Sequence, residues 1–255
     1  MTRETSEGTL CVRQLDHAAF SGDLARRWGG GELPDLAPAE SVILAASRHD
    51  AGWPELDETP TLDPGTSIPH DYRTVPLEDR LAVAERSVAR VAAVDPYAGW
   101  LVSRHFASFH EGADDPDAIR WVTAQVGRRA EMLARARASV DREDLHPLVL
   151  EANLDFVQLL DALSLAAIHG WESWRSDPMA DGYGEERTRF AWERVEIAPR
   201  EVRARVSPYP FAPERVEGEV PARLLEGTRW SDQEELEEAW ETGREVAVEV
   251  VLEAG

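Results

Sequence analysis

Two histidines and two aspartates in this sequence have the types and spacing to hold a metal ion. His49 and Asp50 are adjacent at the end of a predicted helix, so both side chains can turn toward one ion as the backbone leaves the helix. Asp161 falls on the apolar side of a later helical stripe, where burying a carboxylate is costly unless a cation or hydrogen bonds compensate it. His17 lies on the apolar face of an earlier helix. Neutral imidazoles with two carboxylates suit magnesium or a divalent transition metal, so we expect a metal site.

Each of these residues also has an ordinary structural interpretation. Asp161 would be equally satisfied by an ion pair with one of the many arginines, and a single histidine on an apolar face is usually a hydrogen-bonded core residue. The order His17, then His49-Asp50, then Asp161 on three separate helices favours the metal site. With no metal bound, we expect Asp50 and Asp161 to raise each other's pKa, because two nearby carboxylates repel each other.

The elements that must position these residues are mostly helices. Apolar residues recur at helical spacing, and the pairs Asp95-Pro96 and Asp115-Pro116 mark two helix starts. Helices are expected over residues 17–28, 38–49, 77–94, from 96 past 105, 116–140 and 147–171. The proline-rich stretch from Pro54 to Pro76 is expected to be a loop, either a lid or a packed surface segment.

The hydrophobic period falls to two residues after Asp177-Pro178, which indicates strands. A capping box at Ser231 predicts a short helix ending near Gly243, and a strand follows to Leu252. We therefore expect a mainly α fold, with a helical domain over residues 1–176 that carries the metal site. A small α+β unit over residues 177–255 should pack on it.

Composition excludes several classes of function. The 49 acidic and 27 basic residues give a net charge of −22, which disfavours nucleic acid as a partner. Every basic residue is arginine, so Schiff-base and phosphate-loop lysine chemistry are excluded. No apolar run approaches the roughly 20 residues of a membrane span, and Cys11 is the single cysteine. We expect a cytoplasmic protein that acts on a small molecule, with no membrane partner and an open oligomeric state.

The order of the four candidate ligands resembles the metal signature of the HD-domain superfamily of helical phosphohydrolases. This resemblance implies an HD-like helical bundle in which His17, His49, Asp50 and Asp161 bind manganese, magnesium, iron or zinc. Some HD enzymes hold a second metal with further histidines, and His105 is the candidate for that role. Five local motifs carry a closer resemblance, at residues 16–22, 47–53, 95–99, 101–105 and 160–165. They resemble a prokaryotic family of unknown function, DUF3891.

The leading functional hypothesis is a metal-dependent phosphohydrolase acting on a small-molecule phosphoester. Asp50 would hold the metal and orient a water, while His105 would protonate the leaving oxygen or bind the phosphate. Arg48 and Arg104 either clamp the phosphate or face solvent. Two alternatives stay open: a di-iron oxygenase on the same ligand set, and a metal- or ligand-binding module without turnover.

Overall fold

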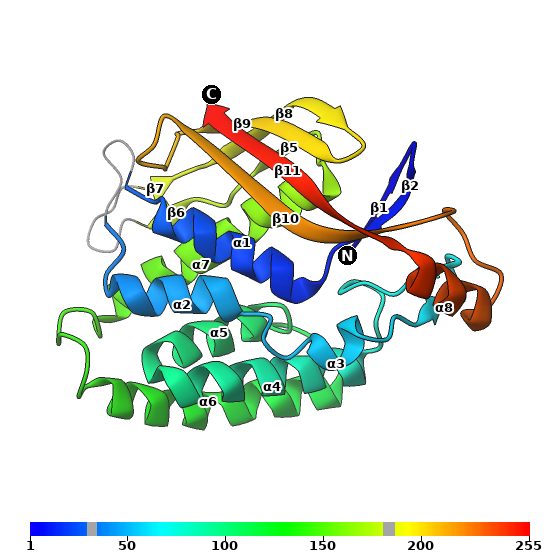
Figure 1. Cartoon of the computed structure of the whole chain (residues 1–255). Helices are drawn as coiled ribbons and strands as arrows, with labels where there is room; N and C mark the ends of the chain where they lie inside the picture. Colours follow the sequence, from blue (N-terminus) through cyan, green and yellow to red (C-terminus); the bar gives the residue numbers. More distant parts are fainter. Residues whose placement is uncertain (30–34, 181–186) are drawn as a thin grey trace.

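A seven-stranded mixed sheet lies over one side of a helical body (Figure 1). The computed structural model describes residues 1–29, 35–180 and 187–255. Neighbouring strands are antiparallel, except that β9 and β11 are parallel. Across the sheet the strands are β1 (Thr2–Thr5), β2 (Gly8–Cys11), β10 (Arg215–Leu225), β11 (Arg244–Ala254), β9 (Glu201–Ser207), β8 (Ala191–Ala198) and β5 (Ser173–Arg175).

The long strands form because their apolar side chains alternate and so cover one face of the sheet. Val202, Ala204 and Val206 of β9 are all fully buried. In the parallel pairing, Val250 and Leu252 of β11 lie opposite Val202 and Ala204. The central strands therefore bring one continuous apolar surface to the helices.

The helices form two layers beneath the sheet (Figure 1). The layer next to the sheet contains α1 (Gln14–Arg26), α2 (Ala39–Arg48) and α7 (Pro147–His169). The outer layer contains α4 (Leu77–Val94), α5 (Pro96–Ser108) and α6 (Pro116–Ala136), while α3 (Pro54–Asp57) and α8 (Gln233–Thr242) are short. The Asp95 and Asp115 side chains accept hydrogen bonds from the first backbone N–H groups of α5 and α6, as predicted.

The prediction of a mainly α, HD-like bundle with an all-helical core was wrong. The chain has an α+β fold whose largest single element is the sheet. The prediction failed because strands distant in sequence join one sheet: β1 and β2 precede α1, and β5 follows α7, yet all three extend the sheet formed by residues 191–254. Helix α1 packs on β10 and α7 packs on β9, so sheet and helices share one hydrophobic core.

The proline-rich stretch is a packed segment of the structure. It contains α3 and a small hairpin of β3 (Leu62–Asp63) and β4 (Ile68–Pro69). Elsewhere, β6 (Met179–Ala180) pairs with β7 (Arg187–Thr188) in an antiparallel register. Leu62 and Ile68 pack against the buried Trp230 and Leu236. The β3–β4 hairpin therefore ties the helical body to the α8 region.

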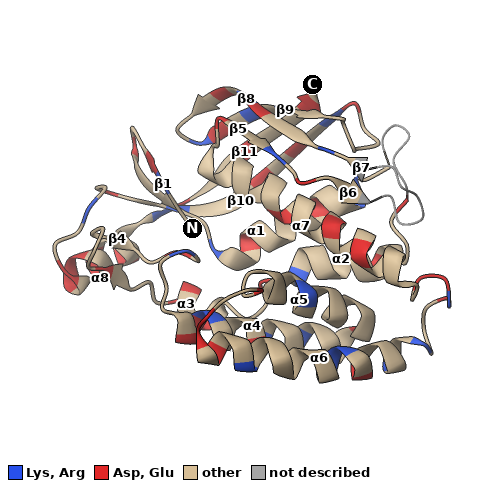
Figure 2. Cartoon of the chain, turned by 180° about the vertical axis from the view of Figure 1, so that it is seen from behind, with Lys and Arg blue, Asp and Glu red and all other residues tan. Residues whose placement is uncertain are grey.

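Acidic residues occur on helices and strands alike in the view of Figure 2. This distribution fits the strong excess of carboxylates over arginines in the sequence. Within the described part of the chain, none of the helices combines the length and apolar character needed to cross a membrane.

Candidate metal centre

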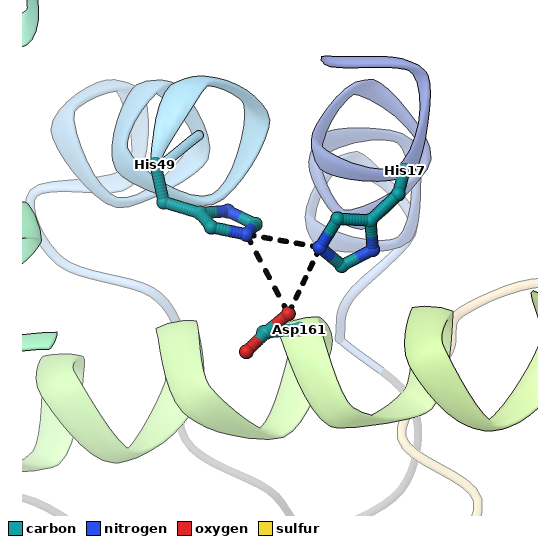
Figure 3. Close-up of side chains that lie close together, drawn as sticks. All are labelled: His17, His49 and Asp161. Carbon is teal, nitrogen blue, oxygen red and sulfur yellow. Dashed lines mark hydrogen bonds and ion pairs between the residues drawn. The ribbon is translucent and has the colours of Figure 1, made fainter. Parts of the chain in front are cut away.

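His17, His49 and Asp161 come together from three helices of the layer next to the sheet (Figure 3). His17 projects from α1, His49 caps the C-terminus of α2, and Asp161 lies in the middle of α7. Together with Asp50 and His105, they line a cavity of about 400 Å³. All five side chains are buried.

The distances between the ligand atoms match those around a shared ion. Nε2 of His17 lies 3.1 Å from Nε2 of His49 and 3.0 Å from Oδ1 of Asp161. Nε2 of His49 lies 3.5 Å from the same Asp161 oxygen. Atoms bound to one ion at about 2.0–2.3 Å are about 2.8–3.7 Å apart at coordination angles of 90–110°. These three residues could therefore hold one ion.

Asp50 lies at the edge of this set. Its Oδ2 atom is 3.6 Å from Nε2 of His17 and 3.5 Å from Nε2 of His49. It falls outside the group of ligand atoms that all lie within 4.8 Å of one another, which contains only His17, His49 and Asp161 among the described residues. Asp50 thus lies on the histidine side of the group, next to the three residues that could hold an ion.

The two imidazoles are oriented by hydrogen bonds on their outer nitrogens. Nδ1 of His49 lies 2.8 Å from the Ala46 carbonyl, which can only accept, so this nitrogen carries the proton. Nδ1 of His17 lies 2.8 Å from Oγ of Ser164, whose own hydroxyl donates to the His17 carbonyl. In the neutral rings both Nε2 atoms therefore present lone pairs to each other. Such bonding on the far nitrogen is the usual support of metal-binding histidines.

Two lone pairs facing each other require a positive charge between or beside them. Without a cation, a proton on His49 can supply that charge. Burial alone would lower the pKa of His49, but the charges of Asp50 and Asp161 outweigh it and raise this pKa to about 9. A divalent cation would meet the same need with the donor atoms already in place, so the residues fit a metal ion.

The site shifts the pKa values of Asp50 and Asp161 in opposite directions. Burial raises the pKa of Asp50. Burial would also raise the pKa of Asp161, but hydrogen bonds from His17 and His49 outweigh it and hold this pKa well below its usual range. The expectation that the two aspartates raise each other's pKa was therefore wrong for Asp161. Among the described residues, the ion-pair partners of Asp161 are His17, His49 and His105, and an arginine is not among them.

Two glycines allow the elements of the site to approach closely. Gly22 of α1 lies against Ser47 of α2, where an added Cβ would come within 2.2 Å of the serine Cβ. Gly52, in the turn after Asp50, leaves no room for a side chain against the backbone of α4, and its N–H donates to Oγ of Ser87 at 2.8 Å. The turn is fixed further because Nε1 of Trp53 donates to Asp50 at 3.0 Å.

His105 reaches the site from α5 in the outer layer. Its Nε2 atom lies 3.6 Å from Oδ2 of Asp161, and its ring packs edge-on against Phe106 and Phe109. Burial lowers the pKa of His105 to about 4. This shift favours the neutral ring at pH 7.

The two arginines suggested as phosphate clamps are not among the residues that line the cavity. Arg48 is exposed, and Arg104 pairs with Glu111 at 2.5 Å. Arg73 and Arg80 line the cavity instead. No feature of the sequence distinguishes these two from the other arginines. Arg80 reaches the cavity from α4, and Arg73 from the turn that precedes this helix.

Gln14 also lines the cavity and was missed by the sequence analysis. It precedes His17 by three residues on α1, and this helical spacing places both side chains on one face. The three-residue spacing from His17 could therefore have identified Gln14 from the sequence. His110 lines the same cavity from the end of α5, on the wall near Arg80.

Comparison with known proteins gives a family and no characterised relative. The family described as "Protein of unknown function (DUF3891)" matches residues 1–227. Neither a curated protein nor a solved structure matches the chain.

Proposed function

The chain belongs to the DUF3891 family, whose description leaves its function open, and we propose that it is a metal-dependent hydrolase of a small-molecule phosphoester. The observation that carries this proposal is the pair of imidazole Nε2 atoms 3.1 Å apart beside Asp161. Both outer nitrogens are already engaged, so the inner ones point toward each other and toward Asp161, where a cation would bind.

The ligands in this proposal are His17, His49, Asp161 and Asp50, with His105 next to them. Three histidines and two carboxylates suit manganese, magnesium, iron or zinc, and the two aspartates balance a divalent charge. When bound, such an ion supplies the acidity that generates a hydroxide nucleophile near neutral pH and polarises a phosphoryl oxygen. Asp50, held by Trp53, orients the attacking water.

The cavity supports a small molecule as the substrate. Its volume of about 400 Å³ lies within the range of sites for small ligands, and its walls are largely aromatic and aliphatic. Arginines in the lining suit an anionic group. Cys11 is buried and unpaired, and the proposal places the protein in a reducing compartment such as the cytoplasm.

The test combines metal analysis of tag-free protein with a panel of phosphomonoester substrates. Wild type should retain about one divalent ion per chain and hydrolyse at least one phosphoester. Asp161→Asn should lose the ion and the activity because it removes the charged ligand shared by both histidines. Asp23→Asn, an exposed aspartate on α1, should change neither.

Other results would redirect or end the proposal. Two irons per chain with oxygen consumption would identify an oxygenase. Metal retention by Asp161→Asn at the wild-type level would reject the ligand set. Tight metal binding with no turnover of any phosphoester would leave a binding module.

A further inference from the structure

Helix α6 carries an apolar stripe on its outer surface, on the side of the molecule opposite the sheet (Figure 1, Figure 2). Its buried residues, which face α4 and α5, are Ala118, Gln125, Met132 and Ala136. On another face, Ile119 is 49% exposed and Val126 is 59% exposed. Val122 and Leu133 are half-buried beside them. Apolar side chains repeated at helical spacing on an outer surface indicate a contact with another protein.

The stripe is apolar to the same extent in both directions from Val126. Val122 and Ala130 lie four residues before and after this valine. Ile119 and Leu133 lie seven residues before and after it. Four and seven residues are close to one and two helical turns, so these side chains follow one line along the helix. A second α6, laid antiparallel with the two copies of Val126 in contact, would therefore place apolar residues opposite apolar residues.

The charges of α6 are divided between its two ends. The acidic residues at its start are Asp114, Asp115 and Asp117, and the basic residues after Val126 are Arg128, Arg129, Arg135 and Arg137. Arg120 and Glu131 depart from this division, and Arg120 is paired with Asp117 in the same chain. Antiparallel copies would place the acidic end of each helix beside the basic end of the other, whereas parallel copies would place like charges together.

Asp115 and Arg137 are the expected ion pair at each end of such an arrangement. They lie eleven residues before and after Val126, which is close to three helical turns, so both fall on the line of the stripe. Both are exposed, and neither forms an ion pair with another residue in the described part of the chain. Asp115 caps α6 through Oδ1 alone, so Oδ2 can accept from an arginine. The net charge of −22 opposes the association of two copies, and this local attraction offsets it.

We propose that α6 is a homodimer interface, in which two copies of this chain pack antiparallel about Val126. The partner is a second copy because both the stripe and the charges are complementary to themselves. One pair of helices buries less area than a standard interface, so the dimer is weak and reversible, with a dissociation constant in the micromolar range. Among the described residues, none of those lining the metal cavity belongs to α6, so this inference does not depend on the proposed function.

Sedimentation equilibrium of the full chain tests the interface, at concentrations from about 1 to 300 µM. Wild type should pass from the mass of one chain to the mass of two. Val126→Asp should weaken association at least tenfold because it brings two carboxylates together, and its exposed position should leave the circular dichroism spectrum unchanged. Val195→Asp, at an exposed apolar position of β8, should associate as wild type. The mass of one chain at every concentration, or equal association of Val126→Asp and wild type, would overturn the interface.

Cysteine cross-linking tests the antiparallel arrangement. A short bismaleimide spans the distance of about 8–10 Å between the axes of packed helices. It should link Val126→Cys to itself because the two copies of residue 126 meet. It should not link Ile119→Cys to itself, because antiparallel packing separates the two copies of residue 119 by about 21 Å along the helix axis. Cys11 is buried and should give no background. Linking of Ile119→Cys to itself as efficient as that of Val126→Cys would overturn the arrangement.

Discussion

At the residue scale, His49 holds a proton at the position where the ion would bind when no metal is present. The pKa of His49 is raised to about 9, above its ordinary value near 6.5, so the proton is held through the neutral range. Since only the neutral imidazole binds a metal, the ion must displace this proton. Proton release and metal binding are therefore linked.

We predict that metal affinity rises with pH. Between about pH 6.5 and 9 the apparent dissociation constant for manganese should fall by up to about tenfold per pH unit, and it should level off above pH 9. Calorimetry at pH 7.5 in buffers of different ionisation enthalpy should show about one proton released per ion. An affinity independent of pH, with no proton released, would contradict the raised pKa.

The same proton stabilises the metal-free fold. Because the pKa of His49 is raised on folding, its contribution is fully present below about pH 6.5 and is lost as the pH rises through about 9. It depends on the carboxylate of Asp161, so Asp161→Asn should destabilise the metal-free protein rather than relieve repulsion. Asp161→Asn is therefore expected to lose stability in chelator whether Asp161 is a metal ligand or a member of a buried ion pair. Metal retention by the variant is the measurement that separates these two roles.

Residue types and spacing indicated which side chains converge but not what surrounds them. Asp161 was selected because a buried carboxylate needs compensation, and His49 and Asp50 because adjacent residues at a helix end can turn toward one point. The structure brings these side chains and His17 to one cavity. The proton-donor role suggested for His105 depended on exposure that no spacing reveals, and burial leaves this ring neutral. Arg80 was beyond prediction because no feature of the sequence distinguishes it from the other arginines.

At the element scale, the close crossing of α1 and α2 sets the distance between His17 and His49. Gly22 occupies the contact point, so we predict that Gly22→Ala pushes the helices apart. The change should cost about 1–3 kcal/mol of unfolding free energy and lower manganese affinity at least tenfold. Chemical denaturation and metal titration measure the two effects.

Gly127→Ala is the matched control for this prediction. Gly127 lies in α6, and an added Cβ there would meet nothing within 4 Å. This variant should be unchanged or about 0.5–1 kcal/mol more stable because alanine favours the helix. Normal metal affinity in Gly22→Ala would show that the helix crossing does not set the ligand distance.

At the scale of the whole molecule, helices were predictable and their assembly was not. Caps and apolar periods are local signals, and α4 begins and ends where the pattern predicted, at Leu77 and Val94. The sheet depends on pairings between distant segments, such as β2 with β10, which no local pattern specifies. Strand β10 itself was missed because Gly218 and Pro221 interrupt its alternation.

The shared core predicts that sheet and metal site unfold together. Val250, nearly fully buried in β11, is far in sequence from every proposed ligand. Val250→Ala should lower the free energy of unfolding by about 2 kcal/mol, with helix signal and metal release shifted equally in one transition. Val195→Ala, an exposed position in β8, should have little effect. A metal-dependent transition unaffected by Val250→Ala would show that residues 1–176 fold alone.

The central place of β11 also orders events during synthesis. All the proposed ligands and both helical layers leave the ribosome before β11, which is the last made of the seven strands and joins β10 to β9. Until it arrives, β9 and β10 present open edges that invite pairing with other chains. The nascent protein thus carries all the proposed ligands on its helices while its sheet is still divided in two, and pairing of β11 with β9 and β10 removes these open edges.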